Sequence, residues 1–402
     1  MVVALCWRSV NARERTASER DWLRVNAHLR RRRYELGVRA ADAYPQATRV
    51  AGTPLLATPS WLPSVPVPLD GIRLGFLPGV PLPRVTDVAA RAPSLFPERP
   101  DGFPYRRHSD VIRELAAPAV FENRTTYRLT EADLTAGQPR LAFGMGRYFD
   151  GIDVGGAAAH EYAAADLGLL AGQDLRAAIG DPCDLAARPA VMAISTLTLR
   201  YDRAAGTASF PLHYRDPARV GHAGGMYQVI PVGVFQPSGE ASWNVAGDFG
   251  LWRCMLREFA EELLGADEDH GSETLPIDYA SWPFARRMTD ALAEGRVRAW
   301  CLGLGTDPLT FAVDLLTVTL IDAPLYDDLF GGAVAGGAAK DSTVKDGTAK
   351  DGTVKDNAEG TVLPRHHFDA ATVARLISGH PFQAAGAALL RLAVRHADTL
   401  LC

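Results

Sequence analysis

Proline dominates one segment of the chain and restricts what that segment can form. Twelve of the 27 prolines lie between Pro54 and Pro104. Each proline fixes φ and removes a backbone hydrogen-bond donor, so we expect an extended, loop-rich segment here. The same segment carries Trp61, Leu74 and Phe76. These large apolar side chains indicate that it wraps over a core.

Length and charge limit the classes of protein that this chain can belong to. A chain of 402 residues is long enough for two domains. Its composition is 47% hydrophobic and 22% charged, which is typical of a protein that buries a full core. The net charge of −5 gives no reason to expect binding to nucleic acid or to an anionic membrane. No stretch approaches 18 apolar residues, so we expect no membrane partner and no transmembrane helix.

The five cysteines, Cys6, Cys183, Cys254, Cys301 and Cys402, are scattered and show no paired spacing. This pattern argues against a zinc site and against a disulfide framework, and it is typical of a reducing compartment. We therefore expect a cytoplasmic protein.

The order of predicted elements indicates an α+β fold, because strands and helices do not alternate regularly. Helices are predicted near residues 14–42, 108–117, 156–171, 248–264, 281–294 and 369–401. Strands are predicted at 193–201, 209–214, 226–235, 297–303 and 309–321, the first two forming a hairpin around the turn-like residues 202–207.

We divide the chain into four parts by composition. Residues 1–185 form a separate helical and proline-rich N-terminal region, and residues 190–330 form the main α+β domain. Residues 331–361 contain a five-residue repeat that begins at Lys340, and this repeat lacks the large apolar side chains that would compensate the entropy of ordering. We expect a disordered insertion there, followed by C-terminal helices in 362–402 that pack on the main domain.

The predicted helix over 248–264 carries the most informative chemistry. At 100° per residue its apolar side chains form one buried face, and Glu258 and Glu262 project about 40° apart at the edge of that face. Glu261 lies one step further outward, where Arg257 is its i−4 neighbour and expected ion-pair partner. Carboxylates that share one face repel one another, and a divalent cation relieves this repulsion. Mg²⁺ or Mn²⁺ prefers such oxygen ligands, although glutamates on a solvated helix face are the common alternative.

The run Arg257-Glu-Phe-Ala-Glu-Glu262 resembles the R-E-U-x-E-E core of the Nudix box, where U is a bulky apolar residue. Upstream, Pro231-Val-Gly233 to Gly239-Glu240 resembles the glycine-containing strand and loop that precede that helix. The resemblance covers roughly residues 190–330 and implies a Nudix-like α/β/α sandwich in the C-terminal half.

In Nudix hydrolases the glutamates of this helix hold Mg²⁺ against a diphosphate. The resemblance therefore implies that Glu258, Glu261 and Glu262, with Glu240 from the loop, are metal ligands, and that Arg257 orients one of them. The departures are specific. Phe249 stands eight residues before Arg257, where the box has a glutamate, and Glu240 matches that glutamate only if the loop is about nine residues longer.

The phrases over residues 147–165, 222–238 and 251–265 also resemble actinobacterial proteins with a Nudix-like C-terminal half, which are associated with helix-turn-helix regulators. Residues 14–42 contain one basic helix, including Arg30 to Arg33, without a clear second recognition helix.

Other candidates have a structural alternative that we favour. Asp150, Asp153 and the pair His160-Glu161 could line a pocket, but capping of helix starts is the more common role. His366-His367 could bind a metal weakly, and Arg30 to Arg33 could bind phosphate, although pairing with acidic residues of the second half is more common. We assign His222 to Gly225 to a loop.

Two functions follow as hypotheses. The first is a Nudix-like protein that binds a nucleotide or another small diphosphate compound with Mg²⁺ and hydrolyses its diphosphate linkage. The second is a ligand-sensing regulatory protein that uses the same pocket without turnover.

Overall fold

Strand β7 (Ala190–Asp202) is the centre of the fold in the computed structural model, which describes residues 14–90, 96–216, 224–267, 270–331, 355–356 and 360–402. It pairs in parallel with β13 (Val313–Asp322) along ten residues. Both strands are rich in Val, Leu, Ile and Thr and are buried along most of their length. Strands buried on both faces are typically this continuously apolar, so the pair must be covered by layers on both sides.

The opposite edge of β7 is shared by three strands in succession. Its first residues pair with β5 (Thr125–Asp133), its middle with β11 (Val232–Val234) and its last with β8 (Thr207–Phe210). The larger sheet runs in the order β1-β2-β12-β13-β7-β5-β6-β4, and the chain is a mixed α+β protein. The other strands of this sheet are β1 Thr48–Arg49, β2 Leu56–Ala57, β3 Val67–Pro68, β4 Arg73–Phe76, β6 Arg140–Arg147, β12 Val297–Thr306 and β16 His366–His367.

A small second sheet lies beside the large one, in the order β10-β9-β15-β14. Its strands span β9 His213–Arg215, β10 Tyr227–Gln228, β14 Lys355–Asp356 and β15 Gly360–Val362.

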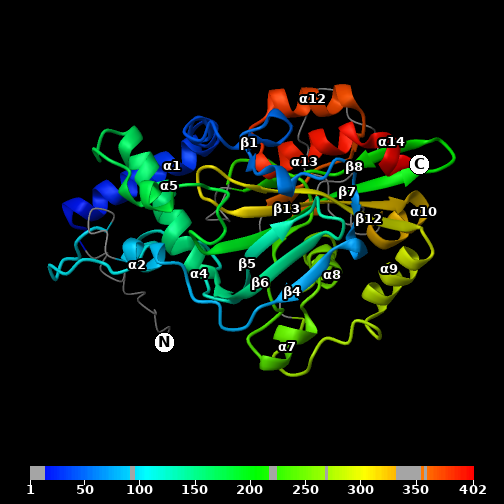
Figure 1. Ribbon diagram of the computed structural model, residues 1–402, viewed down its shortest axis with the longest axis horizontal. Coiled ribbons are helices and arrows are strands. Elements are labelled where there is room, and N and C mark those ends of the chain that lie inside the picture. The colour runs from blue at the N-terminus through cyan, green and yellow to red at the C-terminus, as the bar shows by residue number, and fades with distance from the viewer. Residues whose placement is uncertain (1–13, 91–95, 217–223, 268–269, 332–354, 357–359) are drawn as a thin grey trace, which may run out of the picture.

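Helices cover the sheet from two sides (Figure 1). The C-terminal helix α13 (Ala384–Arg395) packs on β7, β12 and β13, and α8 (Leu251–Phe259) packs on β7 and β11. In the view of Figure 1, α12 and α13 lie above the central strands, and α7 lies below the sheet. The remaining helices of this half are α7 Ser242–Gly247, α9 Pro283–Ala293, α10 Ala323–Tyr326, α12 Ala370–Gly379 and α14 Ala397–Leu401.

The N-terminal helices form a layer at one end of the sheet (Figure 1). Helix α1 (Ala17–Asp42) begins at a capping box, in which the Thr16 side chain accepts from Glu19 N and the Glu19 carboxylate accepts from Thr16 N. It packs against α5 (Ala157–Asp166) around Val25, Leu36 and Ala163. The other helices of this layer are α2 Val85–Ala90, α3 His108–Leu115, α4 Tyr148–Gly151 and α6 Asp174–Ile179.

The proline-rich segment belongs to the main sheet, so the prediction of a separate N-terminal region is wrong. Leu56 in β2 pairs with Thr306 in β12, and Val67 in β3 pairs with Cys301 of the same strand. Leu74 in β4 pairs with Leu141 in β6. These strands are two to four residues long and lie at the margin of the sheet, which is where proline is tolerated.

The local predictions agree with the structure better than the division into parts. The hairpin around residues 202–207 is present as β7 and β8, and the predicted strand 226–235 is divided into β10 and β11. Strands β5 and β6 were not predicted. Most of the predicted insertion 331–361 lies outside the described residues, but its end contributes β14 and part of β15. Within the described part of the chain, no helix is long and apolar enough to cross a membrane.

Candidate functional site

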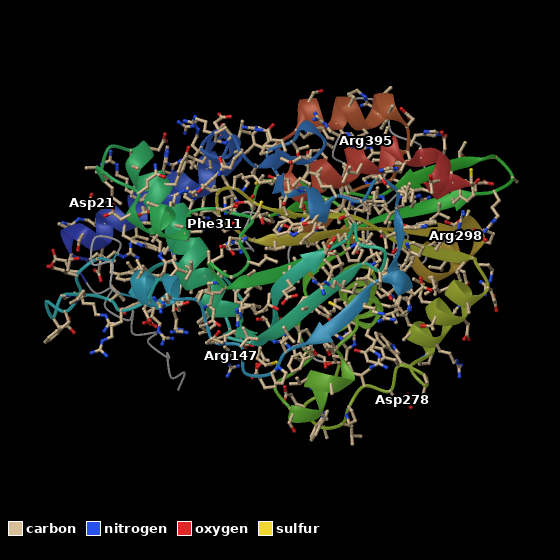
Figure 2. The ribbon with its side chains drawn as sticks, viewed as in Figure 1. Asp21, Arg147, Asp278, Arg298, Phe311 and Arg395 are labelled. Atoms are coloured by element: carbon tan, nitrogen blue, oxygen red, sulfur yellow. The ribbon has the colours of Figure 1, made fainter. Side chains whose placement is uncertain are left out.

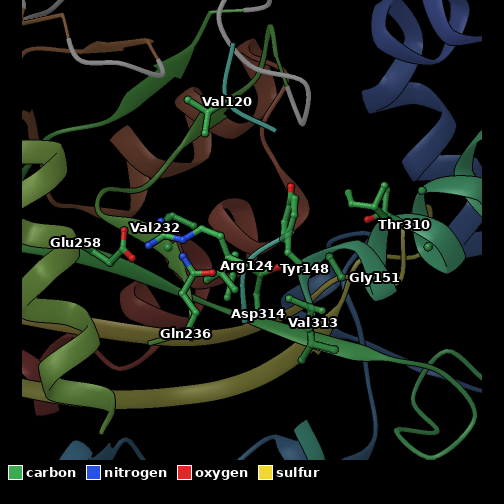
Figure 3. Close-up of a pocket in the computed structure, with 18 of the residues that line it drawn as sticks. Val120, Arg124, Tyr148, Gly151, Val232, Gln236, Glu258, Thr310, Val313 and Asp314 are labelled. Atoms are coloured by element: carbon green, nitrogen blue, oxygen red, sulfur yellow. The ribbon is translucent and has the colours of Figure 1, made fainter. Parts of the chain in front are cut away.

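A cavity of about 590 Å³ opens where β7 begins, between the segment just before β5, strand β11 and helix α8. Figure 3 shows Glu258 on one side of it and Thr310 on the other, with Arg124, Tyr148 and Asp314 between them. We call the two walls the helix side, made of Glu258, Glu261 and Glu262, and the strand side, made of Arg188, Ser195 and Asp314. All of these residues except Ser195 line the cavity directly.

Helix α8 is anchored under the cavity by a buried arginine. Arg257 is 2% exposed and donates from Nη1 to the Tyr279 hydroxyl at 2.6 Å and from Nη2 to the Gln236 carbonyl at 2.6 Å. The Tyr279 hydroxyl donates to Asp248 Oδ1 at 2.7 Å, and Arg257 Nη1 lies 3.6 Å from the same oxygen. The predicted ion pair between Arg257 and Glu261 is therefore wrong. The arginine lies on the buried face of the helix and pairs with Asp248.

Two carboxylates of the helix side meet adjacent residues of β11. Glu262 Oε1 accepts from the backbone N–H of Val232 at 3.0 Å, and its other oxygen lies 3.9 Å from His213 Nδ1. The Glu258 carboxyl occupies the space beside Gly233, where an added Cβ would lie 1.8 Å from it. A glycine is therefore required at position 233 for Glu258 to pack against the strand. Because Val232 and Gly233 are consecutive, the two carboxylates lie side by side.

Glu261 points to a different neighbour. Its Oε1 lies 3.2 Å from His270 Nε2 in the loop after the helix. Residues 260–264 form a π-helical turn instead of continuing α8, and such a turn changes the angle between successive side chains. This turn explains why a straight helix did not predict the partner of Glu261 correctly.

Glu240 lies outside the lining of the cavity. Its carboxylate accepts from Thr125 N at 2.6 Å and Thr125 Oγ1 at 2.8 Å, and it pairs with Arg147 at 2.7 Å near the rim of the molecule (Figure 2). Partial burial opposes ionisation, but these hydrogen bonds and the arginine hold the pKa of Glu240 below its usual value. The structure thus brings Glu258, Glu261 and Glu262 to one cavity and leaves Glu240 at the start of β5.

The strand side contains a buried carboxyl that the sequence did not single out. Asp314, the second residue of β13, is 9% exposed, and its Oδ1 accepts from Ser195 Oγ at 2.8 Å. Burial raises the pKa of Asp314 to about 7, the Ser195 hydrogen bond opposes this shift, and nearby Asp307 adds to it. A lone aspartate inside the apolar run 309–321 was the signal that could have identified it.

Arg188 is the second missed residue of the strand side. It is 1% exposed, and its Nη2 donates to the Pro182 carbonyl at 2.8 Å and to Thr306 Oγ1 at 3.2 Å. Its Nε and Nη1 are also buried and have no acceptor among the described residues. Burial lowers the pKa of Arg188 to about 10. The guanidinium lies 5.8 Å from the ring centroid of Phe311, in the interior of the molecule (Figure 2).

Most of the lesser candidates have structural roles. Asp150 accepts from Arg147 N at 2.8 Å and Asp153 from Ser109 N at 2.7 Å, so the capping interpretation is confirmed for both. Glu161 likewise accepts from two backbone N–H groups at the start of α6, Leu175 and Arg176.

The remaining candidates lie away from the cavity. His160 stacks on Trp22, and His367 pairs with Asp369 at 3.0 Å. Arg33 lines a small cleft together with Asp307 of the second half. His222 lies outside the described residues. In the part of the chain that the structure describes, no three His, Cys, Asp or Glu side chains are grouped to hold a metal ion by themselves.

A scan against models of known protein families finds no match for this chain, and a search of curated proteins finds none either.

Proposed function

We propose that the cavity binds a nucleotide or another small diphosphate compound with Mg²⁺ or Mn²⁺ and hydrolyses its diphosphate linkage. The proposal includes the Nudix-like relationship inferred from the sequence, with α8 as the metal-binding helix of an α/β/α sandwich. One observation carries it: Glu258 and Glu262 lie side by side on β11, at the wall of a cavity large enough for a small molecule.

The donor set suits magnesium. Mg²⁺ is commonly held by one or two carboxylates together with substrate phosphates and water, instead of by a complete cage of protein ligands. Glu258 and Glu262 would supply the two carboxylates, with Glu261 next to them. When bound, the ion would polarise the phosphoryl oxygens and lower the pKa of a bound water.

The protein side of the reaction is positioning and charge. Gly233 fixes the Glu258 carboxyl against β11, and the Val232 N–H fixes that of Glu262. Arg124 and Arg215 also line the cavity and would counter the charge of the phosphates.

A second candidate function is supported by the existing partners of the helix side. Glu261 lies against His270, and Glu262 against Val232 and His213, so each carboxylate already has a structural role. In a protein that senses a ligand without turnover, these carboxylates would shape the cavity and would not need to bind a metal.

The test uses a panel of dinucleotides and nucleoside diphosphate sugars with Mg²⁺. We expect hydrolysis by the wild type and a loss of about 100-fold or more in kcat for Glu258→Gln and Glu262→Gln, because the metal contributes several kcal/mol of transition-state stabilisation. Glu294→Gln is the matched control, since Glu294 pairs with Arg296 on the surface. Binding without turnover that is unchanged in the two variants would contradict the enzyme and support the sensor.

A further inference from the structure

Asp314 differs from two other buried carboxylates, Asp248 and Glu161, in how its charge is compensated. Asp248 accepts from Ser238 N, Ser238 Oγ and Tyr279 and lies near Arg257, and Glu161 accepts two backbone N–H groups. Asp314 accepts one hydrogen bond, from the neutral hydroxyl of Ser195. Among the described residues, none of the lysines or arginines comes within ion-pairing distance of it.

A buried carboxylate without a cation is costly to the fold. Removal from water favours the protonated form, which is why the pKa of Asp314 rises to about 7. At neutral pH such a group is present in both protonation states, and this is the condition under which a side chain transfers protons most effectively.

The sheet register places Asp314 across the cavity from the helix side. Asp314 in β13 is the partner of Ala193 in β7, and Ala193 is the partner of Val234 in β11. Two strand spacings separate Asp314 from β11, which is about 10 Å between their backbones. The carboxylates of Glu258 and Glu262 reach from the helix to β11 and pack against it. A small ligand in the cavity therefore lies between these carboxylates and Asp314 (Figure 3).

We propose that Asp314 is the catalytic proton acceptor of this cavity and that Ser195 is its positioning residue. This inference rests on the proposed hydrolysis. A water oxygen forms a bond to phosphorus, the bridging P–O bond breaks, and the water proton passes to the Asp314 carboxylate. The second phosphate leaves with the electron pair of the broken bond. Ser195 holds Oδ1 by its hydroxyl, so the other carboxyl oxygen is the one that takes the proton.

Few charged groups surround Asp314. Ser195 reaches it from β7, and Asp307, in the turn before β13, raises its pKa by charge repulsion. Arg33 and Tyr34 of α1 and Gln383 before α13 line the small cleft on its other side. Of these, Asp307 and Arg33 carry charge at neutral pH, and Asp307 is the one that acts on the pKa of Asp314.

The experiment measures kcat and the Kd of the magnesium complex of inorganic pyrophosphate from pH 5 to 9 in Asp314→Asn and Ser195→Ala. We expect Asp314→Asn to lower kcat by about 100-fold or more while Kd stays within threefold, because general base catalysis contributes roughly 10²–10⁴-fold. The acidic limb of the wild-type profile should disappear. In Ser195→Ala the limb should move to higher pH, because the hydrogen bond that favours the ionised form is lost. Asp398→Asn, exposed on α14, is the control.

Failure of the two proposals can be separated. If the wild type binds magnesium pyrophosphate without turning over any compound of the panel, the hydrolysis proposal fails. The catalytic role of Asp314 then fails with it, whereas failure of the Asp314 proposal alone leaves the wild type active. For an active wild type, calorimetry at pH 7 in buffers of different ionisation enthalpy is the second measurement: binding to the wild type should change the number of bound protons and binding to Asp314→Asn should not. Equal proton linkage, or kcat within threefold of wild type with an unchanged acidic limb, overturns the inference, and so does a wild type that neither binds nor turns over.

Discussion

The two sides of the cavity compensate their buried charges in opposite ways. Beneath the helix side, the buried Arg257 of the same helix is enclosed by Tyr279, Gln236 and Asp248, and Glu262 of the helix side accepts a backbone N–H. On the strand side, Arg188 leaves two buried nitrogens without an acceptor among the described residues, and Asp314 has one neutral donor. Charges that are fully paired stabilise a fold, whereas incompletely paired charges cost stability and are common where a protein binds or reacts. The difference separates the helix side, whose carboxylates are held in place and would bind the metal, from the strand side, where we propose the proton transfer.

The largest effect should come from breaking the helix side. We expect Arg257→Met to lower the free energy of unfolding by about 3–5 kcal/mol, because it leaves Asp248 buried beside no cation. Urea denaturation at pH 7 measures this. Arg253→Met, one turn earlier and exposed on the same helix, should cost less than about 1 kcal/mol. A cost of less than about 1 kcal/mol for Arg257→Met would remove the contrast between the two sides.

The second largest effect should be a pH-dependent change in stability that comes from Asp314 on the strand side. The folded-state pKa of Asp314 is raised from 3.8 to about 7, so its contribution to stability is present below pH 3.8 and is lost as the pH rises to about 7. Asp314→Asn should therefore equal the wild type in stability near pH 4 and exceed it above pH 7, by on the order of a few kcal/mol. The measurement is the free energy of unfolding of both proteins from pH 4 to 8. Parallel curves would show that Asp314 does not titrate differently in the folded state.

Gly233→Ala tests whether activity depends on the position of the Glu258 carboxyl against β11. The added Cβ would displace the Glu258 carboxyl, so we expect a loss of about 100-fold in kcat with magnesium pyrophosphate or in the affinity for Mg²⁺. Gly247→Ala is the matched control, because an added Cβ there meets no atom within 4 Å. Activity and Mg²⁺ affinity within threefold of wild type in Gly233→Ala would show that the position of Glu258 is not important.

The smallest effect is expected for the incompletely paired arginine. Arg188→Met removes two hydrogen bonds but also removes two buried N–H groups that lack acceptors, and these contributions nearly cancel. We expect a change of no more than about 1 kcal/mol in the free energy of unfolding, measured as for Arg257→Met. A decrease of 3 kcal/mol or more in the free energy of unfolding would show that Arg188 stabilises the fold as strongly as Arg257 does.

The helix side could be predicted from a local sequence pattern because its three residues are close together in the chain. Glu258, Glu261 and Glu262 lie within five consecutive residues, and helical periodicity identifies the face that they share. The partners of these residues were beyond such reasoning. Asp248 and Tyr279 reach Arg257 from other segments, and the π-helical turn at 260–264 alters the periodicity itself.

The strand side could not be assembled in the same way. Ser195 and Asp314 are 119 residues apart, and only the parallel register of β7 and β13 brings them together. Strands β5 and β6 were missed for a similar reason, since their polar residues, such as Arg128 and Glu131, obscure the alternation that marks a strand. The predicted boundary near residue 185 was based on composition. Composition distinguishes the proline-rich segment from the later strands, but it does not show that the two pair in one sheet.

The pairing of Leu56 with Thr306 has a consequence for synthesis of the chain. About 250 residues lie between these partners, so at 5–20 residues per second β2 waits roughly 10–50 s on the ribosome before β12 exists. Strand β1 precedes β2 and pairs with one of its edges, but the other edge stays open for this time and is a template for association with other chains. The prolines around it remove the backbone donors that such association requires, so they protect the nascent segment until its own partner is made.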